Sequence, residues 1–323
     1  MNCLIFTEAG EDAGFGHLTR CISILQAFSH YGIETSIIVA GTDQNILDAF
    51  GPESILFHEW HEDKNFLDSY LQNTDLAIID SYMCEEEIYQ HIAARSGITL
   101  CIDDHNRLGY PPGYVLNGSI GAPLLSYTES GEITYLLGTA YQPMRKEFWA
   151  VTPVTIRPKV KNILLFFGGG DQRNLNASVP GILRQNFPGI RLHILSKVPP
   201  TDPDDMIRIH PNLDAVQLIA LLREMDLAII AGGQTLYELA RLGLPAVVIK
   251  TAENQNTNIL GWQKTDFIRY IGDWDKLNTE LICKAVIDSL PQENRLRMQH
   301  AGLNEVDGKG AIRTVESLIK RTV

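Results

Sequence analysis

Residues 159–171 read Lys-Val-Lys-Asn-Ile-Leu-Leu-Phe-Phe-Gly-Gly-Gly-Asp, an apolar run that ends in three consecutive glycines. The chain begins in a similar way, because the apolar run at residues 3–6 leads to a glycine loop at residues 13–17. The stretch 149–158, before the second run, holds two prolines and shows no helical periodicity. A strand, a glycine loop and a helix that start again at mid-chain predict two similar α/β domains rather than one large sheet.

Both halves of the chain alternate short apolar runs with helical patterns. The predicted strands lie at residues 3–6, 35–39, 76–79, 99–102, 162–167, 191–195, 227–230 and 246–249. Short continuous apolar strands separated by helices are typical of parallel sheets covered on both faces. We predict an N-terminal Rossmann-like domain over residues 1–150 and a C-terminal one over residues 151–323, whose last helices could pack back on the first domain. In such a pair, the carboxyl ends of both sheets face a shared cleft where ligands bind.

The composition is that of an ordinary globular protein, with 45% hydrophobic and 20% charged residues. The 27 Lys and Arg residues against 39 Asp and Glu give a net charge of −12, which opposes non-specific binding to nucleic acid or to an anionic membrane. No apolar stretch approaches the roughly 20 residues of a membrane span, and the N-terminus lacks a signal-peptide pattern. Five cysteines without a C-x-x-C pair indicate reduced thiols. These features predict a soluble, cytoplasmic protein.

The first glycine loop contains candidate site residues. Gly14 and Gly16 let the backbone approach a ligand, and the helix that follows offers free N–H donors at its N-terminus. His17 lies where a ligand would meet this helix, and an imidazole can act as a base on a bound water. Arg20, one turn later, could pair with a phosphate. The alternatives are a strand-to-helix turn without a ligand, a surface histidine and a solvated arginine.

The second half offers backbone donors and polar side chains after three predicted strands. Gly168, Gly169 and Gly170 follow the strand at 162–167. Gly232, Gly233, Gln234 and Thr235 follow the strand at 227–230, with Glu238 in the next helix, and Asn254 and Gln255 follow the strand at 246–249. A glycine turn that opens a helix can hold a diphosphate on its N–H groups. A carboxylate one turn further could accept hydrogen bonds from ribose, and amides suit a sugar. The competing interpretations are an exposed helix charge for Glu238 and a helix cap for Asn254.

Polar residues also follow two strands of the first half. Ser81 and Tyr82 come with Asp80 after the strand at 76–79, and Asp104 follows the strand at 99–102. We expect them at the same edge of the sheet as His17, where a sugar or phosphate would bind, although adjacent aspartates are more often caps and turn formers. The chain has no H-E-x-x-H, cysteine ligand set, G-x-S-x-G, Walker A or complete G-x-G-x-x-G motif. The sequence therefore predicts no metal site and no cofactor.

The run Gly14-Phe15-Gly16-His17-Leu18-Thr19-Arg20-Cys21 resembles the G-x-G-H-x-x-R-C signature of the UDP-sugar hydrolases of the pseudaminic acid pathway. That family includes spore-coat polysaccharide biosynthesis proteins and is similar in fold to MurG-type GT-B glycosyltransferases. Further matches follow in the family's order, at residues 80–82, 102–104, 137–148, 167–171, 232–238, 243–245, 254–255 and 307–310. The resemblance covers nearly the whole chain and implies a GT-B-like fold, with two Rossmann-like domains whose parallel sheets face an inter-domain cleft.

The resemblance also implies an activity, which is removal of UDP from a UDP-2,4-diacetamido-2,4,6-trideoxyhexose by water attack at the anomeric carbon, with inversion. It makes His17 the general base. The implied contacts are Gly232, Gly233 and Gln234 with the diphosphate, Glu238 with ribose, the region of Gly168–Gly170 with uracil, and Asn254, Gln255, Ser81 and Tyr82 with the sugar. Residues 6–12 and 117–120 depart from the family pattern, which leaves the sugar open. A glycosyltransferase acting on an acceptor is the main alternative, and a non-catalytic nucleotide-sugar binder is a third.

Overall fold

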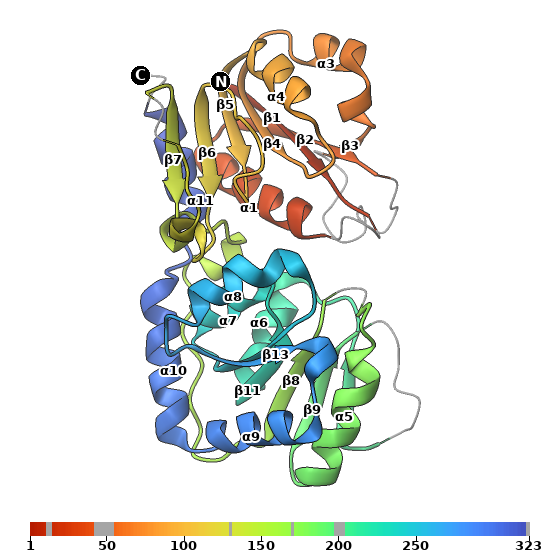
Figure 1. Cartoon of the computed structure of the whole chain (residues 1–323). Coiled ribbons are helices and arrows are strands. Elements are labelled where there is room, and N and C mark those ends of the chain that lie inside the picture. The colour runs from red at the N-terminus through yellow and green to blue at the C-terminus, as the bar shows by residue number, and fades with distance from the viewer. Residues whose placement is uncertain (11–14, 42–54, 129–130, 169–170, 197–203, 321–323) are drawn as a thin grey trace. The chain divides into compact units, whose positions relative to one another are not determined.

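The chain consists of two structural units (Figure 1). The structure, a computed structural model, describes residues 1–10, 15–41, 55–128, 131–168, 171–196 and 204–320. The first unit comprises Met1–Trp149 together with Gly308–Val323, and the second comprises Ala150–Asp307. The chain therefore returns to its first unit for its last helix.

Among the described residues of the first unit, seven parallel strands form one sheet in the order β3-β2-β1-β4-β5-β6-β7 (Figure 1). They are β1 (Asn2–Glu8), β2 (Glu34–Ala40), β3 (Ile55–Phe57), β4 (Thr74–Asp80), β5 (Ser96–Ile102), β6 (Gly113–Asn117) and β7 (Ile133–Leu137). The strand order reverses at β1, which pairs with β2 on one side and with β4 on the other. In open α/β sheets, ligands bind beyond the carboxyl ends of the strands at such a switch point.

Helices cover both faces of this sheet because its central strands are apolar on both faces. Ile5 and Ile78 share one core with helices α1 and α11, whereas Phe6 and Ile79 share another with α3 and α4. The helices are α1 (Gly16–His30), α3 (Lys64–Tyr70), α4 (Glu86–Ala93) and α11 (Gly310–Ile319), with 3₁₀ helices at Trp60–Glu62, Ala122–Leu124, Thr139–Tyr141 and Lys146–Phe148.

In the described part of the second unit, six parallel strands take the order β10-β9-β8-β11-β12-β13. They are β8 (Asn162–Phe166), β9 (Arg191–Leu195), β10 (Ile207–His210), β11 (Leu227–Ala231), β12 (Ala246–Lys250) and β13 (Ile268–Asp273). The helices are α5 (Leu175–Asn186), α6 (Ala215–Glu224), α7 (Thr235–Leu242), α8 (Asn256–Trp262), α9 (Thr279–Ser289) and α10 (Gln292–Glu305), with 3₁₀ helices at Glu253–Gln255 and Trp274–Lys276. The order reverses between β8 and β11, so this unit has a switch point like that of the first.

The predicted α/β class with two parallel sheets is confirmed. The sequence patterns missed the edge strands of both sheets, β3, β7, β10 and β13, which are mostly only partly buried, so their apolar periodicity is weak. They also missed the inner strand β6, whose run is interrupted early by glycine and tyrosine. Within the described residues, no helix has both the length and the apolar character needed to cross a membrane.

Gly310, the first residue of α11, lies against the backbone of the first unit. A Cβ atom at this position would stand 2.1 Å from the carbonyl oxygen of Gln142. We expect Gly310→Ala to lower the free energy of unfolding by about 1–3 kcal/mol, because the backbone must move to admit the methyl group. Gly181 in α5 is the matched control, since an added Cβ would meet nothing within 4 Å and Gly181→Ala should stabilise the helix by about 0.5–1 kcal/mol. Urea unfolding measures both variants, and a Gly310→Ala protein as stable as wild type would contradict the close contact.

Candidate active site

His17 lies in the first turn of α1, directly after the loop from β1. Its side chain is 7% exposed, and Nδ1 lies 2.6 Å from Oδ1 of Asp80. Asp80 is the last residue of β4 and stands opposite Thr7 of β1 in the parallel register. The pairing of β1 with β4 therefore joins two residues that are 63 positions apart in the sequence.

The protonation of the His17 ring follows from its neighbours. Burial would raise the pKa of Asp80, but the positive charges of Arg20 and of protonated His17 hold that pKa well below its usual range. An ionised carboxylate only accepts hydrogen bonds, so Nδ1 donates to Asp80 and Nε2 keeps its lone pair. Nη2 of Arg20 also lies 3.2 Å from Nδ1, but it donates to Oδ1 of Asp80 at 2.6 Å. The shorter contact with the carboxylate decides the tautomer, and His17 is a proton acceptor through Nε2.

Arg20 joins two aspartates at this edge of the sheet. Its Nε and Nη2 donate to Asp80 at 2.5 and 2.6 Å, and its Nη1 lies 2.8 Å from both carboxylate oxygens of Asp104. Burial opposes ionisation of Asp104, but Arg20 and a hydrogen bond from Tyr82 lower its pKa overall. Arg20 and the two carboxylates therefore form one ionic network. The alternative prediction, that Arg20 is simply solvated, is wrong.

Tyr82 packs against the ring of His17 and is itself exposed. The two rings meet edge to face, with centroids 4.4 Å apart and planes at 88°, and the side chain of Tyr82 is 38% exposed. Its hydroxyl donates to Oδ2 of Asp104 at 2.5 Å. Burial and the charge of Asp104 raise the pKa of Tyr82, so the phenol keeps its proton at neutral pH.

Glu8, the last residue of β1, is a member of this site that the sequence analysis did not identify. Its carboxylate accepts hydrogen bonds from the Ser81 hydroxyl and from the backbone N–H groups of Tyr82 at 2.9 Å and Met83 at 3.3 Å. Its Oε1 lies 3.9 Å from Nε2 of His17. The available signal was an acidic residue two positions after the apolar run at residues 3–6, at the edge where His17 was expected.

The predicted residues of the second unit follow β8, β11 and β12. The N–H of Gly232 donates to Oε1 of Gln255 at 3.2 Å, and Nδ2 of Asn258 donates to the Gly232 carbonyl at 2.7 Å. A Cβ at Gly232 would stand 2.7 Å from the side chain of Ile259, whereas one at Gly233 would meet nothing within 4 Å. Packing thus requires the first glycine, and the second leaves open space in front of the helix.

The other predicted residues occupy varied positions. Gln234 is the N-cap residue of α7 and Thr235 is its first residue. Glu238 lies in the first turn, and Asn254 is exposed in the 3₁₀ helix after β12. Gly168 has a φ of +96°, a backbone conformation that favours glycine. Gly16 starts α1 with open space around its Cα. Gly14, Gly169 and Gly170 lie outside the described residues. In the first unit, the structure brings together His17, Arg20, Ser81, Tyr82 and Asp104.

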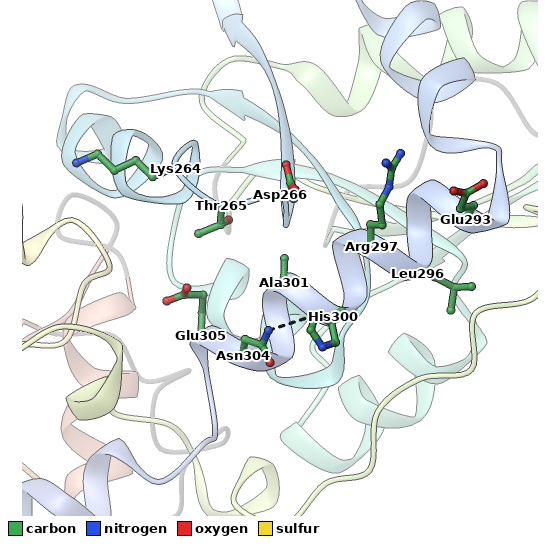
Figure 2. Close-up of a pocket in the computed structure, with 10 residues that line it drawn as sticks. All are labelled: Lys264, Thr265, Asp266, Glu293, Leu296, Arg297, His300, Ala301, Asn304 and Glu305. Carbon is green, nitrogen blue, oxygen red and sulfur yellow. Dashed lines mark hydrogen bonds between the residues drawn. The ribbon is translucent and has the colours of Figure 1, made fainter.

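A groove of about 550 Å³ lies elsewhere on the second unit. Figure 2 shows its side chains, which come from the α8–β13 loop and from α10. Its charged residues carry both signs and are Lys264, Arg297, Asp266, Glu293 and Glu305. None of them was a predicted site residue. Among the described residues, no group of three or more His, Cys, Asp or Glu side chains is arranged to hold a metal ion.

Comparisons with known proteins place this geometry in context. No family model matches the chain. It is 27% identical over 246 residues to the pseudaminic acid cytidylyltransferase and UDP-2,4-diacetamido-2,4,6-trideoxy-beta-L-altropyranose hydrolase of Helicobacter pylori, an alignment that covers 75% of this chain and 43% of that protein. It is 23% identical to the spore coat polysaccharide biosynthesis protein SpsG of Bacillus subtilis, with 98% of both chains covered. The resemblance that the motifs predicted is confirmed. The chain spans less than half the length of the Helicobacter pylori protein.

Solved structures show the same fold. MurG of Acinetobacter baumannii superimposes with a TM-score of 0.67 over 99% of this chain and 100% of that one, at 14% identity. The UDP-GlcNAc 2-epimerase of Neisseria meningitidis, bound to UDP-GlcNAc, gives a TM-score of 0.66 over 99% of this chain and 100% of that one, at 12% identity. The GT-B-like fold is therefore confirmed, and at these identities the likeness concerns the fold alone.

Proposed function

We propose that this protein is an enzyme that acts on nucleotide sugars and hydrolyses a UDP-activated amino-sugar, with UDP-2,4-diacetamido-2,4,6-trideoxyhexose as the expected substrate. In the reaction, the oxygen of a water molecule bonds to the anomeric carbon. The bond from that carbon to the diphosphate oxygen breaks, and UDP leaves with the electron pair. One proton of the water passes to Nε2 of His17, and the configuration at the anomeric carbon inverts.

The observation that carries the proposal is the hydrogen bond between Asp80 and Nδ1 of His17. A buried, ionised aspartate fixes the tautomer in which Nε2 is the acceptor, and it stabilises the imidazolium that forms when a proton arrives. Arg20 keeps Asp80 ionised, and Tyr82 holds the ring from the side. Because UDP is a good leaving group, one positioned base with donors around the diphosphate is enough chemistry.

For the UDP moiety, we assign the glycine loop before α7 in the second unit. Gly233 leaves open space at the start of that helix, and a helix N-terminus suits a diphosphate. Gln234 belongs to the same diphosphate subsite, and Glu238 in the first turn is assigned to the ribose hydroxyls. The Helicobacter pylori relative is named for hydrolysis of a UDP sugar of the proposed kind, which supports the choice of substrate. The cytoplasmic location and the lack of nucleic-acid or membrane partners stay predictions.

The test is UDP release from a panel of UDP-amino-sugars, including UDP-GlcNAc, without any acceptor. We expect turnover of the diacetamido-trideoxy substrate in water alone and, by NMR, a free sugar of inverted anomeric configuration. UDP release that starts only when an acceptor is added would instead make the protein a glycosyltransferase. A change of configuration at C2 would point to the epimerase reaction named for the Neisseria meningitidis structure. Binding of UDP without any turnover would leave a nucleotide-sugar binder.

A further inference from the structure

Glu8 is a buried carboxylate to which the proposed reaction gives no role so far. It is 2% exposed and ends β1, an inner strand of the sheet. Among the described residues, its hydrogen-bond donors are the Ser81 hydroxyl and two backbone N–H groups, none of which carries a positive charge. Burying a carboxylate without a permanent cationic partner destabilises the fold. A neighbouring side chain that becomes cationic would interact favourably with it.

That neighbour is the Nε2 edge of His17. Oε1 of Glu8 lies 3.9 Å from Nε2, while Asp80 occupies Nδ1 on the opposite edge of the ring. The distance is too long for a direct hydrogen bond, so Glu8 does not itself occupy Nε2. Among the described residues, the other charged or titratable groups in contact with the ring are Arg20 from α1 and Tyr82 from the loop after β4.

We propose that Glu8 is a positioning residue that stabilises the imidazolium form of His17 after Nε2 has taken the proton from water. The role rests on the function proposed above. When His17 is neutral, its ring faces one carboxylate at Nδ1 and offers a lone pair at Nε2. When it is protonated, the cation lies between Glu8 and Asp80, so the negative charge of Glu8 favours the state that follows proton transfer. Proton transfer from water becomes easier without any contact between Glu8 and the sugar.

The test is an NMR titration of the His17 ring in wild type and in Glu8→Gln, which needs no substrate. Removing the negative charge removes a stabiliser of the imidazolium, so His17 should hold its proton less firmly. We expect the pH midpoint of the His17 ring signals to be lower in Glu8→Gln than in wild type. The acidic limb of the pH–rate profile for UDP release should move to lower pH by the same amount, with a lower maximal rate.

Two controls separate charge from structure. Ser81→Ala removes the hydroxyl that donates to Glu8 and keeps the charge of Glu8, so it should not lower the pH midpoint of His17. Glu62→Gln removes a carboxylate whose side chain is 78% exposed, and it should leave the His17 signals unchanged. In wild type, the carboxylate carbon signal of Glu8 should shift at the pH where the ring signals of His17 change. This measurement tests the proposal even if Glu8→Gln does not fold. An unmoved midpoint, or a Glu8 signal insensitive to His17, would overturn the proposal. Because both signals are read without a sugar, failure of the hydrolase assay would leave this result intact.

Discussion

Replacing His17 with alanine is expected to lower the rate of UDP release by about 10²- to 10⁴-fold, because a positioned general base contributes an effect of that size. Asp80→Asn should cause a loss of similar size, because the asparagine amide can donate to Nδ1 and place the ring proton on Nε2, where the acceptor is needed. The double variant should be little slower than the slower single variant, since the two residues act as one unit. Single-turnover and steady-state UDP release measure these rates.

The matched control is His91 in helix α4. Its Nε2 lies 2.8 Å from Oδ1 of Asp68, and it belongs to no proposed site. His91→Ala should release UDP at the wild-type rate. UDP affinity, measured by calorimetry, should stay the same in His17→Ala, because the diphosphate is assigned to the second unit. Full activity of His17→Ala would remove the base from the mechanism and leave the fold unaffected.

Replacing Arg20 with methionine is expected to lower the free energy of unfolding by about 3–5 kcal/mol at neutral pH, the usual cost of breaking a buried ion pair. Asp80 is fully buried and the side chain of Asp104 is 26% exposed, so both carboxylates would lose their cation in a site with little water. Chemical unfolding at pH 7 measures the loss.

The pH dependence of this loss has a definite sign. In wild type, the pKa values of Asp80 and Asp104 are lowered, so their contribution to stability is present above the ordinary carboxyl pKa of about 4 and is lost as the pH falls. Without Arg20, burial raises the pKa values of both groups, opposed only by His17 at Asp80 and by Tyr82 at Asp104, so both pKa values rise and the variant gains stability relative to wild type on acidification. The difference between the two proteins should therefore shrink between pH 7 and pH 4.

Arg95 provides the comparison for this prediction. It forms an ion pair with Asp68 at 2.6 Å, in which the side chains are 40% and 48% exposed. Arg95→Met should cost less than about 1 kcal/mol, because water already solvates both charges. Equal losses for Arg20→Met and Arg95→Met would contradict the view that Arg20 neutralises a buried carboxylate pair.

Much of the fold follows from local sequence patterns. The apolar runs at residues 3–6 and 76–79 lie within β1 and β4, because a central parallel strand needs apolar side chains on both faces. The edge strand β7 escaped prediction because three of its five residues are only partly buried and one is exposed. Glu8 escaped because its role depends on Ser81, 73 positions away.

The amino-acid sequence alone specifies the α/β class, the strand–glycine loop–helix unit that occurs in both halves, and His17 as the candidate base. Each of these depends on residues that are close together in the chain or on motifs read in order. The tertiary structure was needed to show that Asp80 meets Nδ1 of His17, that Glu8 faces Nε2, and that Arg20 joins two carboxylates. These contacts depend on distances of a few ångströms. The parallel pairing and register of β1, β4 and β5 set these distances, and apolar periodicity does not encode them.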